Sequence, residues 1–301
     1  MHGGLAASAR QHLGLEREGM QEIIDPLGGL VGIEPFAQLG VLRGDADRAA
    51  AGMAVVAIAG RYADLALKIE EIREATDWQI PIQLKLGAAR VYDDVRMAVK
   101  CGPDSIYIDS MEGGTGAGPH IATEDTGVPG IAAIRQARRA IDELGKRGEI
   151  SLVYAGGIRN GGDVAKALAL GADAVAIGHS VLMALNCNKE IPESDFENEI
   201  GVPAGYCYHC HTGRCPVGVA TQDPELRRRL DPDEAAERVY NFLHTLTLEA
   251  QMLARACGKT SVHSLEPEDL AALTLEASAM AQVPLAGTDY TVGVDNYHKI
   301  G

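Results

Sequence analysis

The feature that most constrains the fold is an alternation between short apolar runs rich in β-branched residues and longer segments with helical periodicity. The apolar runs cover residues 53–60, 80–87, 104–110, 150–157 and 172–179. The segments between them with apolar residues at helical spacing cover 62–76, 91–102, 130–148 and 161–172. Because strands that alternate with helices form repeated β/α units around a parallel sheet, the chain is predicted to be an α/β protein. Runs this apolar are typical of strands buried on both faces.

A barrel is the first architecture that this pattern suggests. A (β/α)8 TIM-type barrel needs eight units and typically about 250 residues, whereas five units are recognisable here and residues 1–50 carry at most one weak strand pattern. We therefore expect a (β/α)8 TIM-type barrel that is incomplete in its N-terminal half, and we favour the explanation that the sequence is part of a longer chain. The expected divisions are a poorly assigned segment at 1–50, a β/α barrel part at 51–186, a cysteine-rich segment at 187–230 and a helical region at 231–301.

Two helices are expected in the C-terminal region. Residues 231–258 read as one long helix, with Pro232 near its start, acidic residues in its first turn and Gly258 at its end. Residues 264–274 suggest a second, shorter helix with Ser264 as its N-cap. The long helix is expected to pack on the outside of the barrel.

The charge of the chain argues against two classes of partner. The sequence has 42 acidic and 27 basic residues and a formal net charge of -15, whereas nucleic acids and anionic membranes are bound by basic surfaces. No stretch has the roughly 18 consecutive apolar residues of a membrane-spanning helix, and residues 1–50 lack the layout of a signal peptide. We therefore expect a cytoplasmic protein that binds neither nucleic acid nor membrane.

Glycine-rich stretches follow three of the predicted strands, at the edge where barrels build their active sites. The residues of interest are Gly113, Gly114 and Thr115 after the third strand, Gly156 and Gly157 after the fourth, and Gly178 and His179 after the fifth. Glycines expose backbone N–H groups and let a planar or anionic ligand approach closely. Barrels often bind phosphate in the loops after their last two strands. The last four of these residues are therefore candidate phosphate ligands, with ordinary turn glycines as the alternative.

Lys85 lies inside the apolar run 80–87, where a buried ammonium is costly unless it meets a negative charge or a cofactor. It is therefore a candidate cofactor contact, and the alternative is a strand-end lysine that reaches solvent. Asp109, Glu112 and His120 flank the first glycine-rich loop. They either contact a substrate or cap loops and strand ends.

Four of the six cysteines fall in one short region, namely Cys187, Cys207, Cys210 and Cys215. The last three have the spacing C-x2-C-x4-C, and disulfides are disfavoured in a cytoplasmic chain. Clustered thiolates suit an iron–sulfur cluster. Zinc is a second option, although His209 and His211 do not restore the two-armed spacing of structural zinc sites, and thiols without a metal are a third. Cys101 and Cys257 are expected to be packing residues.

Taken together, these motifs resemble the FMN-binding synthase domain of glutamate synthase large subunits. The stretches that carry the resemblance are "IQLKLG", "SMEGGTGAGP", "YAGGIRNGGDVAKALALGADAVAIG" and "CHTGRCPVGVATQDPELRRRL". Residues from 54 to about 230 follow the family in order. Within the family, the likeness is greatest to the stand-alone subunits of archaeal-type glutamate synthase and of N-methylglutamate synthase.

The resemblance implies a (β/α)8 barrel at 51–186 that holds FMN, followed by an iron–sulfur cluster. Lys85 would lie beside the flavin and the substrate, the loop 113–117 would close over them, and catalytic contacts are implied for Lys85, Gly114 and Thr115. The FMN contacts implied are Lys85, Gly113, Gly114, Thr115, Gly156, Gly157, Gly178 and His179. Cys187, Cys210 and Cys215 match the three ligands of a 3Fe–4S cluster, and Cys207 as a fourth ligand would allow a 4Fe–4S cluster.

The implied reaction joins an amine, either ammonia or methylamine, to the carbon framework of 2-oxoglutarate or glutamate. In glutamate synthesis FMN reduces the imine of 2-oxoglutarate with electrons passed through the cluster, and the electron donor is not identified by the sequence. In the N-methylglutamate branch, a methylamine–glutamate N-methyltransferase exchanges the amine without net redox change. Glutaminase-like and other synthase subunits are the implied partners.

Two alternatives stay open. The missing strands motivate a non-catalytic electron-transfer or assembly subunit of such a complex. Another FMN barrel oxidoreductase, of the IMP dehydrogenase type, would share the paired glycine loops, but the cysteine segment speaks against it.

Overall fold

The structure is a computed structural model, and it describes residues 54–56, 62–114, 121, 125–187, 189 and 209–294. All of these belong to one compact unit, Ala50–Gly301. The poorly assigned segment 1–50, Thr115, His120 and Cys207 lie outside the described residues.

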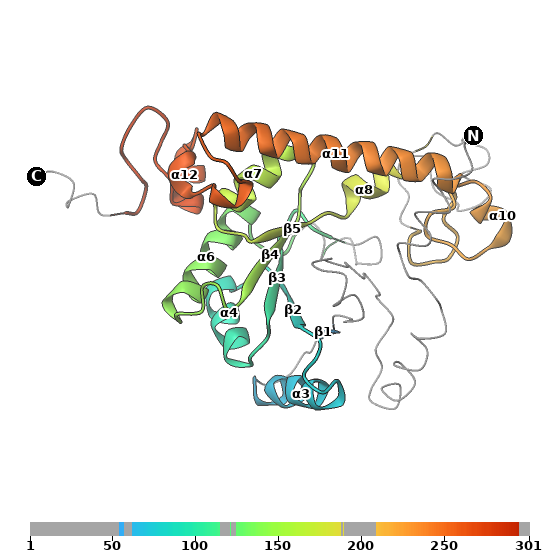
Figure 1. Cartoon of the computed structure of the whole chain (residues 1–301), viewed down its shortest axis with the longest axis horizontal. Coiled ribbons are helices and arrows are strands. Elements are labelled where there is room, and N and C mark those ends of the chain that lie inside the picture. Colours follow the sequence, from blue (N-terminus) through green and yellow to red (C-terminus); the bar gives the residue numbers. More distant parts are fainter. Residues whose placement is uncertain are drawn as a thin grey trace, which may run out of the picture. The chain divides into compact units, whose positions relative to one another are not determined.

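The five predicted strands are confirmed, and they form one parallel sheet (Figure 1). The strands are β1 (Ala54–Val56), β2 (Ile82–Gly87), β3 (Ser105–Asp109), β4 (Ser151–Ala155) and β5 (Ala174–Ala176). Their order in the sheet is β1-β2-β3-β4-β5, and every neighbouring pair is parallel. This is the arrangement of consecutive β/α units. Over the described residues the sheet does not close, in agreement with the expectation of an incomplete (β/α)8 barrel.

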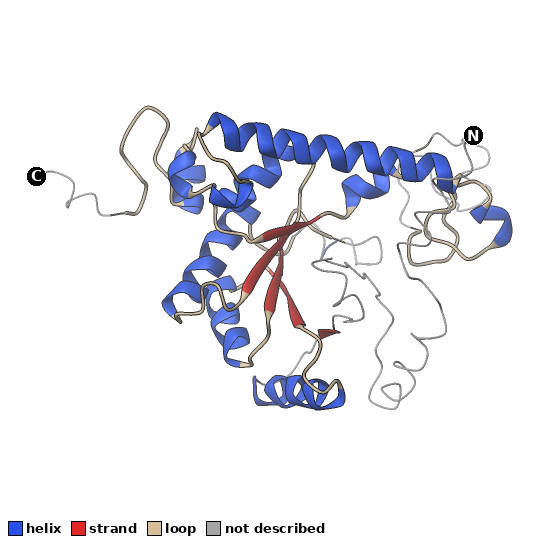
Figure 2. Cartoon of the chain, viewed as in Figure 1, coloured by secondary structure: helices blue, strands red, loops and turns tan. Residues whose placement is uncertain are grey.

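The predicted crossover helices are also confirmed (Figure 2). They are α3 (Tyr62–Ala75), α4 (Val91–Lys100), α6 (Gly130–Glu143) and α7 (Gly161–Ala169), and α8 (His179–Ala184) follows β5. Helix α7 begins at the N-cap Asn160, whose side chain accepts a hydrogen bond from the amide of Asp163 at 3.0 Å. Helices α3, α4, α6 and α7 each return the chain to the start of the next strand.

The core lies between the sheet and the helices. The core face of the central strands buries Ile82, Leu84, Ile106, Ile108 and Leu152. These side chains pack with the apolar stripes of α4, α6 and α7, notably Val91, Val95, Ala133, Ile134, Ala137, Ile141, Val164 and Leu168. Burial of this kind contributes roughly 25 cal/mol per Å² of apolar surface, so the layer stabilises the arrangement of strands that positions the loops.

The opposite face of the sheet corrects one prediction. We expected both faces to be buried, but the alternate residues Lys85, Tyr107 and Val153 are exposed or half-buried. In a barrel this face turns inward and is covered by the remaining strands. The described part of the sheet therefore presents a partly polar, open face beside the candidate site.

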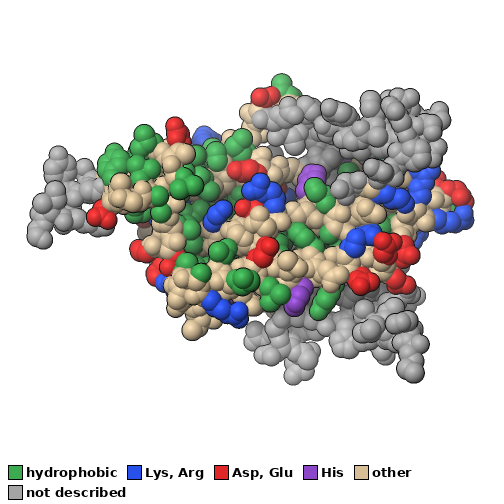
Figure 3. All heavy atoms as spheres, turned by 90° about the horizontal axis from the view of Figure 1, so that it is seen from above, with side chains coloured by type: hydrophobic (Ala, Val, Ile, Leu, Met, Phe, Trp, Pro, Cys, Tyr) green, Lys and Arg blue, Asp and Glu red, His purple; other side chains and the backbone are tan. Residues whose placement is uncertain are grey.

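The long C-terminal helix is confirmed as α11 (Pro232–Ala256), preceded by the short α10 (Pro224–Arg227). Both begin at an Asp-Pro pair, in which Asp223 or Asp231 accepts hydrogen bonds from the amides of the first turn. Helix α11 lies along α7 and α8 (Figure 1). Near its start, acidic and basic side chains gather side by side (Figure 3), and they include the ion pair of Arg238 with Glu234. Arg238 also donates to the carbonyl of Ala184 at 3.1 Å, so this end of α11 is fastened to α8.

The predicted helix at 264–274 is wrong. This stretch contains two short 3₁₀ turns, η2 (Val262–Ser264) and η3 (Pro267–Asp269), and the following helix α12 is Leu275–Ala281, with Thr274 as its N-cap. Ser264 ends a turn instead of capping a helix. The physical reason is Pro267, which forces Glu266 into an extended conformation (φ −142°, ψ 166°) and so prevents a continuous helix.

None of the described helices is long and apolar enough to cross a membrane.

Candidate functional site

The candidate site lies at the carboxyl edge of the sheet, where the loops after β2, β3 and β4 meet. Main-chain hydrogen bonds join these loops, because Ala88 N donates to Asp109 O at 2.8 Å and Ser110 N donates to Ala155 O at 3.0 Å. Parallel strands bring all their carboxyl ends to one edge, which is where ligands bind in such sheets. The topology therefore assembles the glycine-rich loops from distant parts of the sequence.

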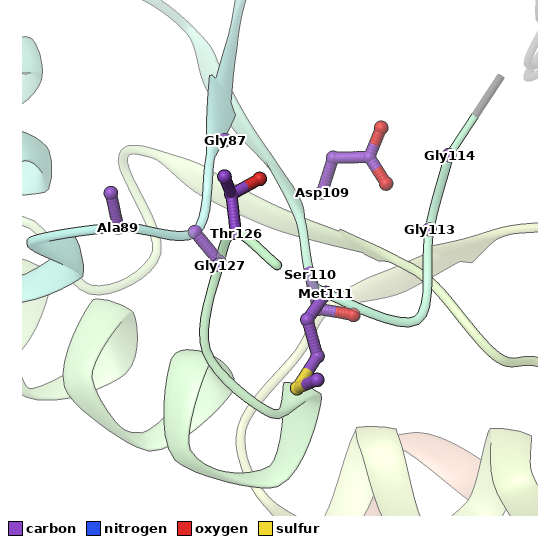
Figure 4. Close-up of a pocket in the computed structure, with 10 residues that line it drawn as sticks. Gly87, Ala89, Asp109, Ser110, Met111, Gly113, Gly114, Thr126 and Gly127 are labelled. Atoms are coloured by element: carbon purple, nitrogen blue, oxygen red, sulfur yellow. The ribbon is translucent and has the colours of Figure 1, made fainter. Parts of the chain in front are cut away.

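An open hollow of about 260 Å³ lies at this edge (Figure 4). Its lining is Gly87, Ala88, Ala89, Asp109, Ser110, Met111, Gly113, Gly114, Thr126 and Gly127. Small residues predominate, so the backbone is accessible and a flat ligand can approach it closely. The carboxylate of Asp109 and the hydroxyl groups of Ser110 and Thr126 are the polar side-chain groups of this lining.

Lys85 stands on the face of β2 opposite the core formed with α4, α6 and α7, and its partner is Asp109. The ammonium Nζ lies 2.8 Å from Oδ2 of Asp109 and 5.0 Å from the ring centroid of Tyr107. Tyr107 is the register neighbour of Lys85 on β3, and Asp109 is the register neighbour of Gly87. The Lys85 side chain is 42% exposed, and its ammonium is held at the sheet edge by the contact with Asp109. Burial raises the pKa of Tyr107 to about 12, and the charge of Asp109 adds to this shift.

A second group of side chains joins the loops after β3 and β4, and two of its members, Ser110 and Tyr154, were missed by sequence reasoning. Ser110 Oγ donates to Oε2 of Glu112 at 2.6 Å and lies 3.0 Å from Oη of Tyr154. Tyr154 Oη donates to the carbonyl oxygen of Gly156 at 2.8 Å. Burial raises the pKa of Tyr154 to about 12. The hydroxyl therefore keeps its proton at neutral pH.

The carboxylate of Glu112 has a structural role. It accepts a hydrogen bond from the amide of Gly130, with 3.0 Å to Oε2, at the first residue of α6. An acidic side chain at a helix N-terminus satisfies an amide that has no partner within the helix and interacts favourably with the helix dipole. Of the two alternatives for Glu112, substrate contact or capping, its position in the structure is that of a cap.

The structure brings the first two glycine loops together. A Cβ on Gly113 would overlap the carboxylate of Asp109, and a Cβ on Gly156 would overlap Ser110 Oγ and lie 3.0 Å from the amide nitrogen of Gly113. Gly156 and Gly157 have φ of +122° and +68°, the region that favours glycine. Close approach and backbone conformation therefore both require glycine at this edge.

The third glycine stretch is connected to the second. Ser180 Oγ donates to the carbonyl oxygen of Ile158 at 2.5 Å, which joins the start of α8 to the loop after β4. Gly178 and His179 are exposed, and a Cβ on Gly178 would meet no atom of the described residues within 4 Å. Within the described chain, the amides of Gly156, Gly157, Gly178 and His179 donate to no acceptor.

These features fit FMN. The phosphate of FMN needs N–H donors, which the four amides without an acceptor in the described chain offer. Its planar ring needs close access to backbone, which the glycine and alanine lining allows. Lys85 offers a positive charge on the adjacent face. The roles of Lys85, Gly113, Gly114, Gly156, Gly157, Gly178 and His179 toward the cofactor stay predictions, and Thr115 lies outside the described residues.

The cysteines do not form a metal site among the described residues. Over 54–56, 62–114, 121, 125–187, 189 and 209–294, no group of three or more His, Cys, Asp or Glu side chains could hold a metal ion. Cys187 is half-buried, Cys210 is exposed and Cys215 is buried, and Cys207 is not described. The described residues therefore do not bring Cys187, Cys210 and Cys215 together as a metal site, and the cluster stays a prediction. Cys101 is buried as expected of a packing residue, whereas Cys257 is exposed at the end of α11.

Comparison with known proteins identifies relatives along most of the chain. A family model described as the conserved region in glutamate synthase matches residues 58–260. The glutamate synthase large subunit-like protein of Rhizobium meliloti (strain 1021) is 53% identical over 230 residues, which cover 76% of this chain and 52% of that protein. The archaeal glutamate synthase (NADPH) of Methanocaldococcus jannaschii is 38% identical over 203 residues, covering 67% of this chain and 36% of that protein.

The chain thus spans about half, or less, of the length of these relatives. Among solved structures, a flavocytochrome b2 variant with pyruvate bound is similar over 78% of this chain and 43% of that chain, with 21% identity and a TM-score of 0.43. A TM-score this low adds nothing to the fold assignment. The family match and the identities over more than two thirds of the chain confirm the resemblance predicted from the sequence, and the chain belongs to the glutamate synthase family.

Proposed function

We propose that this chain is the FMN-binding synthase part of a glutamate synthase-type enzyme, which joins ammonia to the carbon framework of 2-oxoglutarate to give glutamate. The observation that carries the proposal is the assembly, at one sheet edge, of Lys85, the small-residue hollow and four amides that donate to no acceptor among the described residues. Family membership supports the reaction type, and the names of the relatives are those of glutamate synthases.

Each group at the edge has a chemical part in this proposal. FMN, when bound, supplies hydride transfer and electron storage. The amides of Gly156, Gly157, Gly178 and His179 hold the phosphate, and the hollow along Gly87 and Ala88 accepts a planar ring. Lys85 offers its ammonium to a carboxylate of the substrate or to the anionic edge of the ring, while Asp109 holds that ammonium in place at 2.8 Å.

Further components belong to the same proposal. A glutaminase-like partner chain would deliver ammonia, and a separate redox partner would deliver electrons. The C-x2-C-x4-C spacing of Cys207, Cys210 and Cys215 supports an iron–sulfur cluster as a further part of this proposal. Methylamine as the amine, and a non-catalytic role in assembly, are the competing outcomes of the experiments below.

Selective binding of FMN tests the cofactor assignment. Titration of the purified chain with FMN or riboflavin, followed by quenching of flavin fluorescence, is expected to give at least about 100-fold tighter binding of FMN. The reason is that each hydrogen bond to a charged phosphate oxygen contributes about 1.5–3 kcal/mol, and riboflavin lacks the phosphate. Equal affinities would show that the rim amides do not hold a phosphate. Absence of binding by either flavin would contradict the cofactor itself.

The amine is identified by product analysis of the chain assembled with its partner subunits. With reduced methyl viologen as electron donor and 2-oxoglutarate as substrate, we expect ammonia to give glutamate and methylamine to give little product. Appearance of N-methylglutamate from methylamine and glutamate would instead assign the transferase reaction. A complex loaded with FMN that forms neither product would support the assembly role.

The cluster is tested by metal analysis of anaerobically purified protein. Cys210→Ser is expected to lose most of the iron and the brown colour, because it removes a ligand in the C-x2-C-x4-C spacing. Cys257→Ser is the matched control, since Cys257 lies at the exposed end of α11 outside that spacing. Stoichiometric zinc in a colourless protein, or equal iron loss in both variants, would contradict the ligand assignment.

A further inference from the structure

The peptide between Gly156 and Gly157 is the most easily rearranged unit of the candidate phosphate site. Both residues have positive φ, +122° and +68°, and glycine occupies positive and negative φ at similar cost. A Gly-Gly peptide can therefore rotate between two orientations with little steric resistance. A site that depends on the N–H of this peptide needs a group that selects one orientation.

Tyr154 supplies such a group. Its Oη donates to the carbonyl oxygen of Gly156 at 2.8 Å, and the same peptide carries the N–H of Gly157. Because a trans peptide is planar, its N–H points opposite to its C=O, and no peptide bond of the described chain is cis. Holding the carbonyl toward Tyr154 therefore directs the Gly157 N–H away from the Tyr154 hydroxyl, and this amide donates to no acceptor in the described chain.

We propose that Tyr154 is a positioning residue, whose hydroxyl fixes the Gly156–Gly157 peptide so that the Gly157 amide is presented to the phosphate of the bound cofactor. This inference rests on the proposed function for the identity of the ligand. The restraint of the peptide by Tyr154 is independent of the proposed function, because the hydrogen bond lies within the chain itself. Tyr154 does not touch the reacting atoms and acts through the glycine backbone.

The surroundings of Tyr154 hold its hydroxyl at this place. Tyr154 and Ser110 are 5% and 6% exposed, and Oη of Tyr154 lies 3.0 Å from Oγ of Ser110. On the other side lies Gly130, where a Cβ would overlap the Tyr154 hydroxyl. The lack of a side chain at Gly130 thus leaves the space that the hydroxyl occupies.

Tyr154 and Ser110 contribute unequally to holding the carbonyl of Gly156, because their two hydroxyls have only two protons to share among the contacts they make. Three contacts are short, namely Ser110 to Glu112, Ser110 to Tyr154 and Tyr154 to Gly156 O, but the two hydroxyls carry one proton each. The carboxylate and the carbonyl can only accept, so the serine proton goes to Glu112 and the tyrosine proton to Gly156. Removing the Ser110 hydroxyl leaves the bond to Gly156 in place, whereas removing the Tyr154 hydroxyl abolishes it.

The test compares the affinities of variants of the full chain for FMN and riboflavin by fluorescence titration. Tyr154→Phe is expected to weaken FMN binding about tenfold, the effect of losing one positioned hydrogen bond, and to leave riboflavin binding within about twofold, because only the phosphate contact is affected. Ser110→Ala should weaken FMN binding less than Tyr154→Phe. Tyr92→Phe is the matched control, because its hydroxyl bonds Glu143 on the surface between α4 and α6, and it should bind FMN like the wild type.

Gly130→Ala gives an independent check, because its methyl group displaces the Tyr154 hydroxyl without removing it. It should reproduce the selective loss of FMN affinity. In the flavin-free protein, hydrogen exchange at residues 155–158 should be faster in Tyr154→Phe than in Ser110→Ala or Tyr92→Phe. This measurement reports the restraint of the loop backbone in the absence of any ligand.

The outcomes separate this inference from the proposed function. Wild-type protein that binds no flavin contradicts the proposed function. In that case the hydrogen-exchange rates at residues 155–158 still show whether Tyr154 restrains the Gly156–Gly157 peptide. Wild-type protein that prefers FMN, with Tyr154→Phe showing the same preference and the same exchange rates, overturns the positioning role. Equal loss of FMN and riboflavin binding, or failure of Tyr154→Phe to fold, overturns it as well, because the hydroxyl would then serve the fold in general.

Discussion

Replacement of Gly161 by alanine is expected to lower the free energy of unfolding by roughly 3 kcal/mol, at the upper end of the range for overpacked sites. Gly161 begins α7 at the place where α11 crosses it. A Cβ there would overlap the backbone oxygen of Leu246 and lie 2.5 Å from the backbone nitrogen of Ala250. Backbone atoms of a 25-residue helix cannot move aside locally, so α11 must shift as a whole.

The shift would also break a hydrogen bond. The amide of Gly161 donates to Oε2 of Glu249 at 2.7 Å, so a side chain of α11 satisfies an N-terminal amide of α7. The gain in helix propensity from glycine to alanine, about 1 kcal/mol, is smaller than these two losses. Urea denaturation followed by circular dichroism measures the difference.

Gly162→Ala is the matched control for this experiment. It makes the same change one residue further along α7, where the new Cβ would meet the tip of Asn160 at 3.0 Å and Leu253 Cδ1 at 3.8 Å, and no backbone atom of α11 within 4 Å. Its unfolding free energy is expected to stay within about 1 kcal/mol of the wild type. Similar losses in both variants would mean that the contact between α7 and α11 is not the source of the destabilisation.

Sequence periodicity predicted the elements of this fold because each of them is encoded locally. The apolar runs at 80–87 and 104–110 became β2 and β3, and the segment 231–258 became α11, since its Asp-Pro start and closing glycine mark both ends. The failure at 264–274 was also local, because Pro267 outweighs helical spacing. A stricter reading of the residue before that proline would have avoided the error.

The contacts within the site could not be predicted in the same way. Ser110 and Tyr154 are 44 residues apart, and Tyr154 stands in an apolar run where a tyrosine reads as a core residue. Gly161 and Glu249 are 88 residues apart, and no sequence pattern links them. The partner of Lys85 is different, because aligning β2 and β3 as parallel neighbours places Asp109 diagonally beside it. The sequence could therefore have predicted Asp109, before any cofactor, as the partner of Lys85.

Replacement of Lys85 by methionine is expected to lower the rate of glutamate formation about 100-fold or more, while the unfolding midpoint changes little. The rate effect follows because a charged group directed at the reacting molecules contributes roughly 2.7–4 kcal/mol to transition-state stabilisation. The effect on the free energy of unfolding is small because the ion pair with Asp109 joins a half-exposed ammonium to a carboxylate near the surface. Steady-state assays of the chain with its partner subunits, and thermal melting of each protein, measure the two effects.

Two further variants separate the role of the ammonium in catalysis from its role beside Asp109. Lys85→Met leaves the Asp109 carboxylate without its cation at 2.8 Å, and its charge alone would repel an anionic substrate. The double variant Lys85→Met/Asp109→Asn removes that repulsion, and its rate should stay low because the positive charge is still absent. Lys68→Met removes an equivalent lysine that pairs with Glu71 on α3 and should retain full activity. Recovery of the rate in the double variant would show that Lys85 only neutralises the charge of Asp109 and does not act on the substrate or the flavin.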